Sequence, residues 1–528
     1  MSSLFSSFYT ALRGIQNSQA ELQITGQNMT NVNTEGYSRQ RVDSYSLGPL
    51  GLNMRYAQTG AAVGNGVLAI GTSRVRDPYL DVRYRSENAK LGDASTQLYA
   101  MNDIERVLDE TNTDGLEAQM KNLISQLQNL SLSPGDTVAE STVKTSASLL
   151  LSTLNNYAQQ LSSVREQQLS YLKEDAVKQA NQLLSNIAYL NEEIRQSDIC
   201  GNSALELRDQ RDMMIDQLSQ YANIRVETNS VSVGSGRTVD ELTIYFIAGD
   251  GSQTALVSND EYAQFEVESN PGGDPAVELN LNSIDGTVVE MNDLVSSGIF
   301  HGYLTMLNDN GEYDSEEVLD PITGLPTGEM TDATSHGIGY YQKCLDTLAA
   351  KLAETLNDLN STTTESKPLF EASDGSSVIT AANIAISSQW QNASGSYITS
   401  TKQTADSGVD LSNASDNILA MIDAFSTDLD FKTDNGAALF TGTFQEFVTN
   451  MSNTSALEIQ TIGQKNDTYA STLSAVDTQR QSVSSVDINE EGINLIMYNQ
   501  ALTASSRFMT TLDEAMDTVI NRMGIVGR

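Results

Sequence analysis

The sequence contains few of the residues on which disulfides, metal sites and catalytic triads depend. Its 528 residues include two cysteines, two histidines and one tryptophan. Cys200 and Cys344 lie far apart and form no CxxC motif, so we expect two free thiols, each at least half-buried. His301 and His336 belong to no HExxH motif and to no local signature of a Ser-His-Asp triad. We therefore predict no catalytic residue, no metal and no cofactor.

Basic residues and long apolar runs are also scarce. The formal net charge is −39, and residues 226–475 contain 37 acidic but seven basic side chains. Such a surface repels phosphate backbones and anionic bilayers, so neither nucleic acid nor a membrane is an expected partner. There is no run of about 18 apolar residues that could form a membrane helix. The N-terminal residues also lack the basic start, apolar core and small-residue cleavage site that are typical of a cleavable leader. We expect a chain that is secreted without a cleavable signal peptide.

A seven-residue apolar repeat is present at each end of the chain. Apolar residues recur there at alternating steps of three and four, which lines one face of a helix. We expect the two helices to pair as a coiled coil, with Ser2 or Ser3 as the first cap and Gly524 as the stop. The predicted interface residues are Phe5, Phe8, Leu12, Ile15, Leu22 and Met29 in the first helix, and Leu495, Tyr498, Leu502, Met509, Leu512, Met516, Val519 and Met523 in the second.

Polar or small residues interrupt both repeats. Gln19 and Gly26 occupy repeat positions in the first helix, and Ser505 occupies one in the second. A pair with such positions should be marginal by itself, so we interpret the two faces as an assembly interface that neighbouring subunits complete by burying more apolar area. On this interpretation, replacement of Ser505 by leucine is expected to stabilise the pair.

The periodicity changes between the two ends. Residues 40–74 are expected to form a loop with short extended pieces, and the pattern from Pro78 to about Ser219 is helical. One amphipathic helix, which stops before Pro134, is marked by Leu116, Met120, Leu123, Leu127 and Leu130. Alternating patterns predict strands at Asp240–Ile247, Gln264–Val267, Val277–Leu281, Thr287–Met291 and Val378–Ile386.

These patterns predict a mainly α fold with inserted β domains. Its parts are terminal coiled-coil helices, a long helical bundle and one or two β-rich outer domains. The expected terminal assembly domain is 1–40 with 485–528, and the bundle is 75–225 with 336–360 and 441–484. The expected outer parts are a β-rich domain at 226–335 and a smaller β or mixed segment at 361–440.

A dense charge cluster, Leu207-Arg-Asp-Gln-Arg-Asp-Met213, lies in the predicted bundle. We interpret its side chains as solvent-facing salt bridges, in which Arg208 and Arg211 pair with carboxylates along the same helix. A catalytic pair of carboxylates is the alternative.

Several stretches resemble bacterial axial flagellar proteins. The segment from Asn28 to Arg39, followed by Gln40, resembles their N-terminal signature, and Gly36-Tyr-Ser-Arg-Gln40 has the form found in the flagellar hook-associated protein 1 family, the hook-filament junction proteins. The stretch from Gln479 to Arg507 is similar to the C-terminal block of that family. The signature residues are Asn28, Asn31, Gly36, Tyr37, Ser38 and Arg39, with Arg208, Asp209, Arg211 and Asp212 in the central helices.

The resemblance implies a non-enzymatic structural adaptor of the bacterial flagellum that joins hook and filament. It implies type III export to an extracellular position and these partners: further copies of the chain in the flagellar axis, the hook protein, the second hook-filament junction protein, and an export chaperone before secretion. Two alternatives stay open. One is another axial protein, from rod or hook; the other is a glycan-binding or enzymatic module on an axial scaffold, using His301, Asp309 and Trp390.

Overall fold

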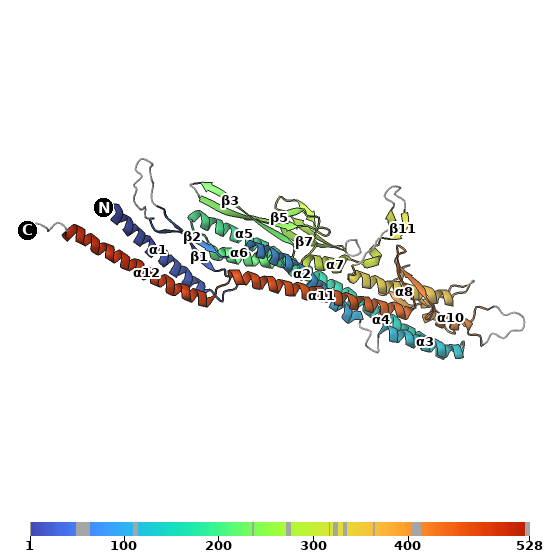
Figure 1. Ribbon diagram of the computed structural model, residues 1–528. Coiled ribbons are helices and arrows are strands. Elements are labelled where there is room, and N and C mark those ends of the chain that lie inside the picture. The colour runs from blue at the N-terminus through green and yellow to red at the C-terminus, as the bar shows by residue number, and fades with distance from the viewer. Residues whose placement is uncertain are drawn as a thin grey trace, which may run out of the picture.

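The computed structural model is an elongated molecule in which two terminal helices project from one end of a helical bundle (Figure 1). It describes residues 2–48, 64–108, 115–234, 237–270, 276–315, 317–319, 326–330, 335–362, 365–403 and 413–522. Within these residues, no helix is both long enough and apolar enough to cross a membrane. The predicted fold, mainly α with inserted β sheets, is confirmed.

Helices supply the frame of the molecule. The terminal helices are α1 (Ser2–Thr30) and α12 (Ile488–Asp517), the second of which continues as the π-helical turn η4 (Thr518–Arg522). The bundle contains α2 (Pro78–Leu108), α3 (Leu116–Leu132), α4 (Thr137–Ser170), the π-helical turn η2 (Tyr171–Ala176), α5 (Val177–Cys200), α6 (Leu205–Leu218), α7 (Ile299–Asn308), η3 (Gly311–Asp314), α8 (Ile338–Asn360), α9 (Ser388–Gln391), α10 (Asp416–Asp423) and α11 (Phe444–Ser484).

The strands form small antiparallel sheets. The larger two have the orders β3-β4-β5-β6 and β7-β8-β9, and four hairpins pair β1 with β2, β10 with β11, β12 with β13 and β14 with β15. The strands are β1 (Gln40–Ser46), β2 (Val67–Arg74), β3 (Ile224–Gly234), β4 (Arg237–Ile247), β5 (Gln253–Ser258), β6 (Glu261–Tyr262), β7 (Gln264–Ser269), β8 (Val277–Asn282), β9 (Val288–Glu290), β10 (Glu317–Leu319), β11 (Pro326–Met330), β12 (Phe370–Ala372), β13 (Ile384–Ile386), β14 (Leu429–Lys432) and β15 (Ala438–Gly442).

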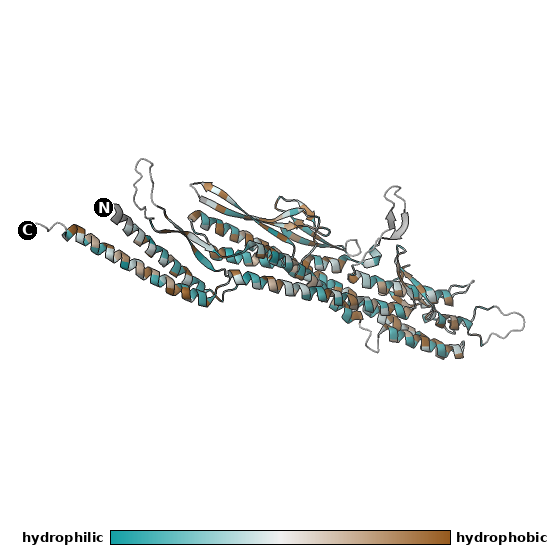
Figure 2. Cartoon of the chain, in the orientation of Figure 1, coloured by the Kyte–Doolittle hydropathy of each residue, from teal (hydrophilic) through white to brown (hydrophobic). Residues whose placement is uncertain are grey.

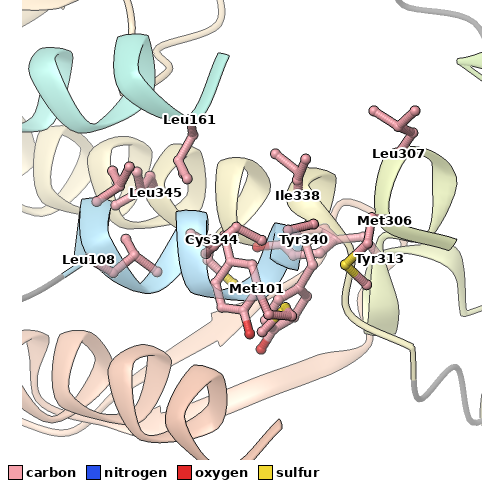
Figure 3. Close-up of a cluster of buried hydrophobic side chains, with 14 of the residues drawn as sticks. Met101, Leu108, Leu161, Met306, Leu307, Tyr313, Ile338, Tyr340, Cys344 and Leu345 are labelled. Carbon is pink, nitrogen blue, oxygen red and sulfur yellow. The ribbon is translucent and has the colours of Figure 1, made fainter. Parts of the chain in front are cut away.

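One continuous apolar core joins the bundle to the larger sheets. Figure 3 shows its middle, where Met101 of α2, Leu161 of α4 and Leu307 of α7 lie near the first turns of α8. All five predicted apolar positions of α3 are buried in it. No described residue of α1, α12 or the β1-β2 hairpin belongs to this core. The apolar core therefore ends where the terminal helices begin.

Local sequence signals explain most element boundaries. The Asp77 carboxylate accepts a hydrogen bond from the Tyr79 N–H, 3.0 Å away, and so caps α2. Gly201 has a φ of +88°, which suits glycine, and ends α5. The strands predicted at residues 240–291 are confirmed as β4, β7, β8 and β9.

The short extended pieces expected within 40–74 are confirmed as β1 and β2, which pair as a hairpin in register from Gln40 opposite Arg74 to Ser46 opposite Val67. One strand prediction is wrong in its start. The predicted strand Val378–Ile386 is shorter, because residues 378–383 form turns around Asn383 and β13 begins at Ile384.

A buried carboxylate attaches residues 390–398 to α4. Glu140 accepts hydrogen bonds from the indole N–H of Trp390 at 3.1 Å, the Ser396 hydroxyl at 2.8 Å, and the backbone N–H groups of Tyr397 at 2.8 Å and Ile398 at 3.2 Å. Lys144, one turn further along α4, donates to the Trp390 carbonyl at 2.6 Å. Glu140 thus acts as the anchor of a segment that lies 250 residues away in sequence.

Replacement of Glu140 by glutamine is expected to loosen this attachment. The amide oxygen accepts fewer and weaker hydrogen bonds than a carboxylate, so we expect a loss of about 1–2 kcal/mol in the free energy of unfolding. Trp390 is the single tryptophan, so its fluorescence reports directly on the site. The emission maximum should shift to longer wavelength in Glu140→Gln and stay unchanged in the control Glu166→Gln, which alters an exposed residue of the same helix.

Candidate functional site

The two terminal helices pack side by side along their length, with the chain ends at the free end of the pair (Figure 1). We call α1 and α12 the terminal pair. On α12 the half-buried positions from Tyr498 to Met516 follow the predicted seven-residue repeat: Tyr498, Leu502, Ser505, Met509, Leu512 and Met516. Leu495 and Val519, at the ends of that repeat, are exposed. Beyond Glu491, no described side chain of α12 is fully buried.

The face of α1 that is buried in the monomer differs in part from the predicted repeat, and the assembly role of the predicted residues stays a prediction. Leu12 is 42% exposed and Gln19 is exposed, whereas Ala11, Ser18 and Thr25 are buried. These three residues recur every seven positions, one residue before the predicted ones. The reason is size, because small side chains let the two helices approach closely. Of the other predicted positions, Phe8, Ile15, Leu22 and Met29 are half-buried; the side chain of Phe5, and Met523 with Gly524, lie outside the described residues.

Ser505 fits a specific place in the terminal pair. A Cβ atom at Gly14 of α1 would lie 2.9 Å from the Ser505 Oγ and 3.6 Å from its Cβ. The helices are therefore in close contact at this point, where only a small side chain has room. The expectation that leucine at position 505 would stabilise the pair is overturned by this contact.

The middle of the terminal pair carries little charge. In α1 only Arg13 and Glu21 are charged; in α12 only Arg507 is charged between Gly492 and Leu512, and the other charges lie near the helix ends, at Glu490, Glu491, Asp513, Glu514 and Asp517. A second seven-residue stripe on each helix is exposed: Tyr9, Leu12, Gln16, Gln19 and Gln23 on α1, and Met497, Ala501, Ala504, Phe508, Thr511 and Ala515 on α12. We call these the outer stripes. Figure 2 shows apolar positions distributed along the whole of α12.

The signature residues end α1 and reverse the chain. The side chain of Asn28, which is buried, donates to the Gln40 carbonyl at 2.9 Å and accepts from the Gln40 N–H at 3.0 Å and from the Tyr37 hydroxyl at 2.9 Å. Asn31 donates back to the Gln27 carbonyl at 3.0 Å. Gly36 has a φ of +76° and faces Met213 of α6, so its backbone conformation favours glycine.

Arg39 then connects this turn to the start of α12. Its guanidinium donates to Glu490 at 2.7 Å and to Glu491 at 2.8 Å, and its backbone N–H donates to the Ser484 carbonyl at 2.8 Å, at the end of α11. Burial lowers the pKa of Arg39, but the two glutamates outweigh burial and raise it. Arg39 therefore stays charged and ties α12 to α11 at the point where the chain bends.

Three carboxylates of α6 form further ion pairs, next to the turn that Arg39 connects to α12. Asp209, Asp212 and Asp216 stand at steps of three and four, which places them on one helix face. Asp209 accepts from Arg74 at 2.8 Å and from the Ser38 N–H at 3.0 Å. We call these carboxylates and their arginine partners the ladder.

The rest of the ladder comes from three other elements. Asp212 accepts from Arg74 of β2 at 2.7 Å and from Arg76 at 2.9 Å. Asp216 accepts from Arg85 of α2 at 2.7 Å and pairs with Arg480 of α11. The ladder therefore holds together three stretches that are far apart in sequence: residues 74–85, α6 and α11.

The interpretation of residues 207–213 as solvent-facing salt bridges is wrong. Asp209 and Arg211 are buried, and the pairing runs between elements. Arg208 pairs with Asp198 at 2.7 Å and Asp240 at 3.3 Å, not with its neighbours along α6. Arg211 donates to the Asn191 side-chain oxygen at 2.9 Å, and burial lowers its pKa to about 10.

Two of the residues proposed for enzyme chemistry share one helix. His301 of α7 and Asp309 at its C-terminal end interact electrostatically, burial raises the pKa of Asp309, and His301 also pairs with Asp93 at 3.0 Å. Trp390 instead contacts Glu140 of α4. In the described part of the chain no three His, Cys, Asp or Glu side chains are grouped so that they could hold a metal. A polar cleft of about 550 Å³ beside the ladder is lined mostly by uncharged residues, and the two arginines that line it, Arg76 and Arg480, are engaged in ion pairs.

The two cysteines are free, as expected, but only one is buried. Cys200 ends α5 and is exposed, which corrects the expectation that both thiols are covered. Cys344 is enclosed between α8 and its neighbours (Figure 3), and burial raises its pKa to about 12. The thiol of Cys344 is therefore protonated and unreactive near neutral pH.

His336 bridges two carboxylates at the entrance to α8. Its Nε2 lies 3.1 Å from Glu312 of η3 and its Nδ1 contacts Glu458 of α11. The ring stacks on Tyr340 at a centroid distance of 4.0 Å. Burial alone would lower the pKa of His336, but the two glutamates outweigh burial and raise it to about 9.

The His336 bridge is expected to give the protein a pH-dependent stability. Because the pKa is higher in the folded chain than the ordinary value of 6.5, the stabilisation is complete below about pH 6.5 and is lost as the pH rises through about 9. His336→Gln should be less stable than the wild type by about 1–2 kcal/mol at pH 6. The difference should vanish by pH 10 in chemical denaturation, and an unchanged difference at pH 10 would contradict the assignment.

Sequence reasoning located the signature residues but not their partners. Arg74, Arg76, Arg85 and Arg480 were missed as parts of one network, as were Glu490 and Glu491. Two signals point to it: the carboxylates at steps of three and four in α6, and the concentration of arginines between residues 74 and 85 in a chain with few basic residues.

Comparisons with known proteins identify relatives of this chain. The family model described as the flagellar hook-associated protein FlgK helical domain matches residues 101–367. The flagellar hook-associated protein 1 of Bacillus subtilis is 27% identical over 542 aligned residues that cover 100% of both chains. That of Escherichia coli is 24% identical, with 99% of this chain and 100% of the relative covered. The flagellar hook junction protein FlgK from Burkholderia pseudomallei has a similar fold, with a TM-score of 0.55, 14% identity, and coverage of 76% of this chain and 100% of that one.

Proposed function

The chain belongs to the flagellar hook-associated protein FlgK family, and from this membership we propose that it is a structural protein of the bacterial flagellum that forms the junction between hook and filament. In this role it is not an enzyme, and it polymerises through the terminal pair. Its partners are copies of itself in the flagellar axis, the hook protein and the second hook-filament junction protein, with an export chaperone before secretion. Its position is extracellular, in the flagellum.

The observation that carries the proposal is the pair of exposed outer stripes on the terminal pair. The exposed charges of α12, at Glu490, Arg507, Asp513, Glu514 and Asp517, lie outside its stripe, and no position of either outer stripe is charged. A helix exposed to water on its outer face normally carries charges there. The outer stripes instead alternate small, apolar and amide side chains at coiled-coil spacing, which suits burial against further helices.

Energetics point in the same direction. The predicted interface residues of α12 are partly exposed in the monomer. Burial of their remaining apolar surface on assembly would contribute a free energy of roughly 25 cal/mol per Å². Two helices packed along one narrow face form a weak unit in water, and the terminal pair shares no apolar core with the bundle. Helices of neighbouring subunits would bury the exposed faces of the terminal pair and so stabilise it.

We assign the rest of the chain accordingly. Residues 1–40 with 485–528 form the assembly domain, and 75–225 with 336–360 and 441–484 form the bundle. The acidic segments 226–335 and 361–440 are outer domains that face the solvent. The ion pairs of the ladder and of Arg39 hold the assembly domain against the bundle.

The proposal is tested by placing a charge on an outer stripe. Phe508→Asp alters a side chain that is 44% exposed, so the melting temperature of the monomer should stay within about 2 °C of the wild type. In a strain that lacks this protein, the variant should fail to join hook and filament, and filament subunits should be lost to the medium. The readouts are electron microscopy of flagella and the amount of filament protein in the medium.

The matched control is Val288→Asp, which introduces the same charge at an exposed apolar residue of β9 in an outer domain. It should restore filaments as well as the wild type does. Normal filaments with Phe508→Asp would contradict the role of the outer stripe. Normal filaments in the strain that lacks the protein altogether would contradict the proposed function itself.

A further inference from the structure

The polar cleft of about 550 Å³ lies where the terminal pair meets the bundle. It is lined by residues 31–38, the turn that follows α1, and by Ser485 and Val486, which connect α11 to α12. Figure 1 shows that α11 ends and α12 begins at this place. We call residues 31–40 and 484–491 the joint. The bundle lines the rest of the cleft, with side chains that include Tyr84 and Asn88 of α2, Met213, Gln217 and Gln220 of α6, and Arg480 and Gln481 of α11.

Hydrogen bonds attach the turn to the bundle at one edge of the cleft. The Ser38 N–H donates to the Asp209 carboxylate at 3.0 Å, and the Arg39 N–H donates to the Ser484 carbonyl at 2.8 Å. Ser38 still lines the cleft, whereas Arg39 lies outside its lining. Within the part of the chain that the structure describes, residues 31–37 form no hydrogen bond and no ion pair with the bundle. Polar contacts therefore fix the turn at its C-terminal end and leave the rest of it free.

The turn also meets the bundle at Gly36 and Met213. A Cβ atom at Gly36 would lie 3.4 Å from the Met213 Sδ and 3.5 Å from its Cβ. Glycine has no side chain that could interlock with the methionine, and the unbranched methionine side chain adapts to its surroundings. No described residue of α1 or α12 belongs to the apolar core of the bundle. This contact therefore offers little resistance to movement of the turn against α6.

We propose that the joint is a hinge about which the terminal pair tilts against the bundle. The pivot consists of residues 38–40 and 484–487, and residues 31–37 move into the cleft as the terminal pair tilts. The cleft is space that the bundle does not fill, so its closure displaces no packed side chain. The ion pairs of Arg39 with Glu490 and Glu491 keep α12 attached during the movement.

The hinge lets one sequence fit two sets of neighbours. A subunit at a junction between hook and filament contacts different proteins on its two sides, and a variable angle at the joint allows the same terminal pair to pack against both. This use of the hinge rests on the proposed function, whereas the hinge itself does not.

Distances between spin labels on the purified chain test the hinge. In a Cys200→Ser background, which leaves only the buried and unreactive native thiol, labels are attached to Gln182→Cys of α5 and Thr503→Cys of α12, two exposed positions on opposite sides of the joint. The control pairs are Thr503→Cys with Gln16→Cys within the terminal pair, and Gln182→Cys with Gln460→Cys within the bundle, again at exposed positions. Double electron-electron resonance should give a broader distribution of distances across the joint than within either control pair.

A tryptophan placed in the cleft supplies the second variant. Gln217 lines the cleft and is exposed, so Gln217→Trp fills the space into which the turn moves without altering the apolar core. It should narrow the distribution across the joint to the width of the controls. Gln210→Trp makes the same change at an exposed position of α6 outside the cleft and should leave the distribution broad.

The outcomes separate the hinge from the proposed function. A distribution across the joint that is as narrow as those of the control pairs overturns the hinge, and equal effects of Gln217→Trp and Gln210→Trp overturn the role of the cleft. In a strain that lacks this protein, Gln217→Trp should restore fewer filaments than Gln210→Trp. Equal restoration by the two variants would overturn the use of the hinge in assembly. Failure of the wild-type chain to join hook and filament counts against the proposed function and leaves the measured distances as evidence for the hinge.

Discussion

Replacement of Asp212 by alanine is expected to lower the free energy of unfolding by about 3–5 kcal/mol, the cost of leaving buried charges without their partner. Asp212 accepts from Arg74 and Arg76, with Arg85 at 3.9 Å. Burial alone would raise the pKa of this carboxyl, but the three arginines outweigh burial and lower it. The stabilisation should therefore persist above pH 4 and be lost only as the pH falls through the lowered pKa.

The control for this prediction is Glu117→Ala, which breaks an exposed ion pair with Lys121 on α3. It should cost less than about 1 kcal/mol. Urea unfolding of both variants measures the two effects. An Asp212→Ala variant as stable as Glu117→Ala would show that the ladder does not hold the elements together.

Replacement of Ser505 by leucine is expected to separate the terminal pair. Ser505 lies against Gly14, and three additional carbon atoms have no room there. Overpacking of this kind costs up to about 3 kcal/mol, which a pair without a shared apolar core cannot absorb. Amide protons of α1 should exchange much faster in the monomer, while those of α3 and α8 keep their wild-type rates.

Ser506→Leu supplies the matched control, because Ser506 is adjacent and exposed. It should leave the exchange rates of α1 unchanged. Slower exchange of α1 in Ser505→Leu would restore the earlier expectation that leucine fills a gap in the pair. The double variant Gly14→Ala with Ser505→Leu should be worse than either single change, since both enlarge the same contact.

The elements that sequence patterns predict well are those whose side chains pack in a regular way. The five buried positions of α3 and the half-buried repeat of α12 follow from helical periodicity. The face of α1 could not be predicted in the same way, since hydrophobicity favours Leu12 over Ala11. Because α12 approaches α1 closely at Gly14, small side chains are buried there instead of large apolar ones. This approach could not be predicted locally, since α12 lies more than 450 residues away in sequence.

The candidate site could be predicted only in part, for an electrostatic reason. Charged residues are exposed unless they are paired, so a single sequence favours a solvent-facing interpretation of Asp209 and Arg211. Asp209 is buried with Arg74 and Ser38 as partners, and Arg211 with Asn191, and no local pattern connects these partners to α6. Resemblance identified the signature residues, and the structure supplies the contacts that these residues make.

Because α1 packs against α12, the terminal pair forms only in a chain that has been synthesised through α12. The bundle buries its core without α12. The partner helix of α1, however, is α12, which lies at the opposite end of the described chain and is synthesised after the bundle. A truncated chain that lacks residues 488–522 would fold its bundle and yet leave α1 alone, with no second helix to present to its neighbours. We therefore expect such a chain to lack one of the two helices that the proposed assembly surface requires.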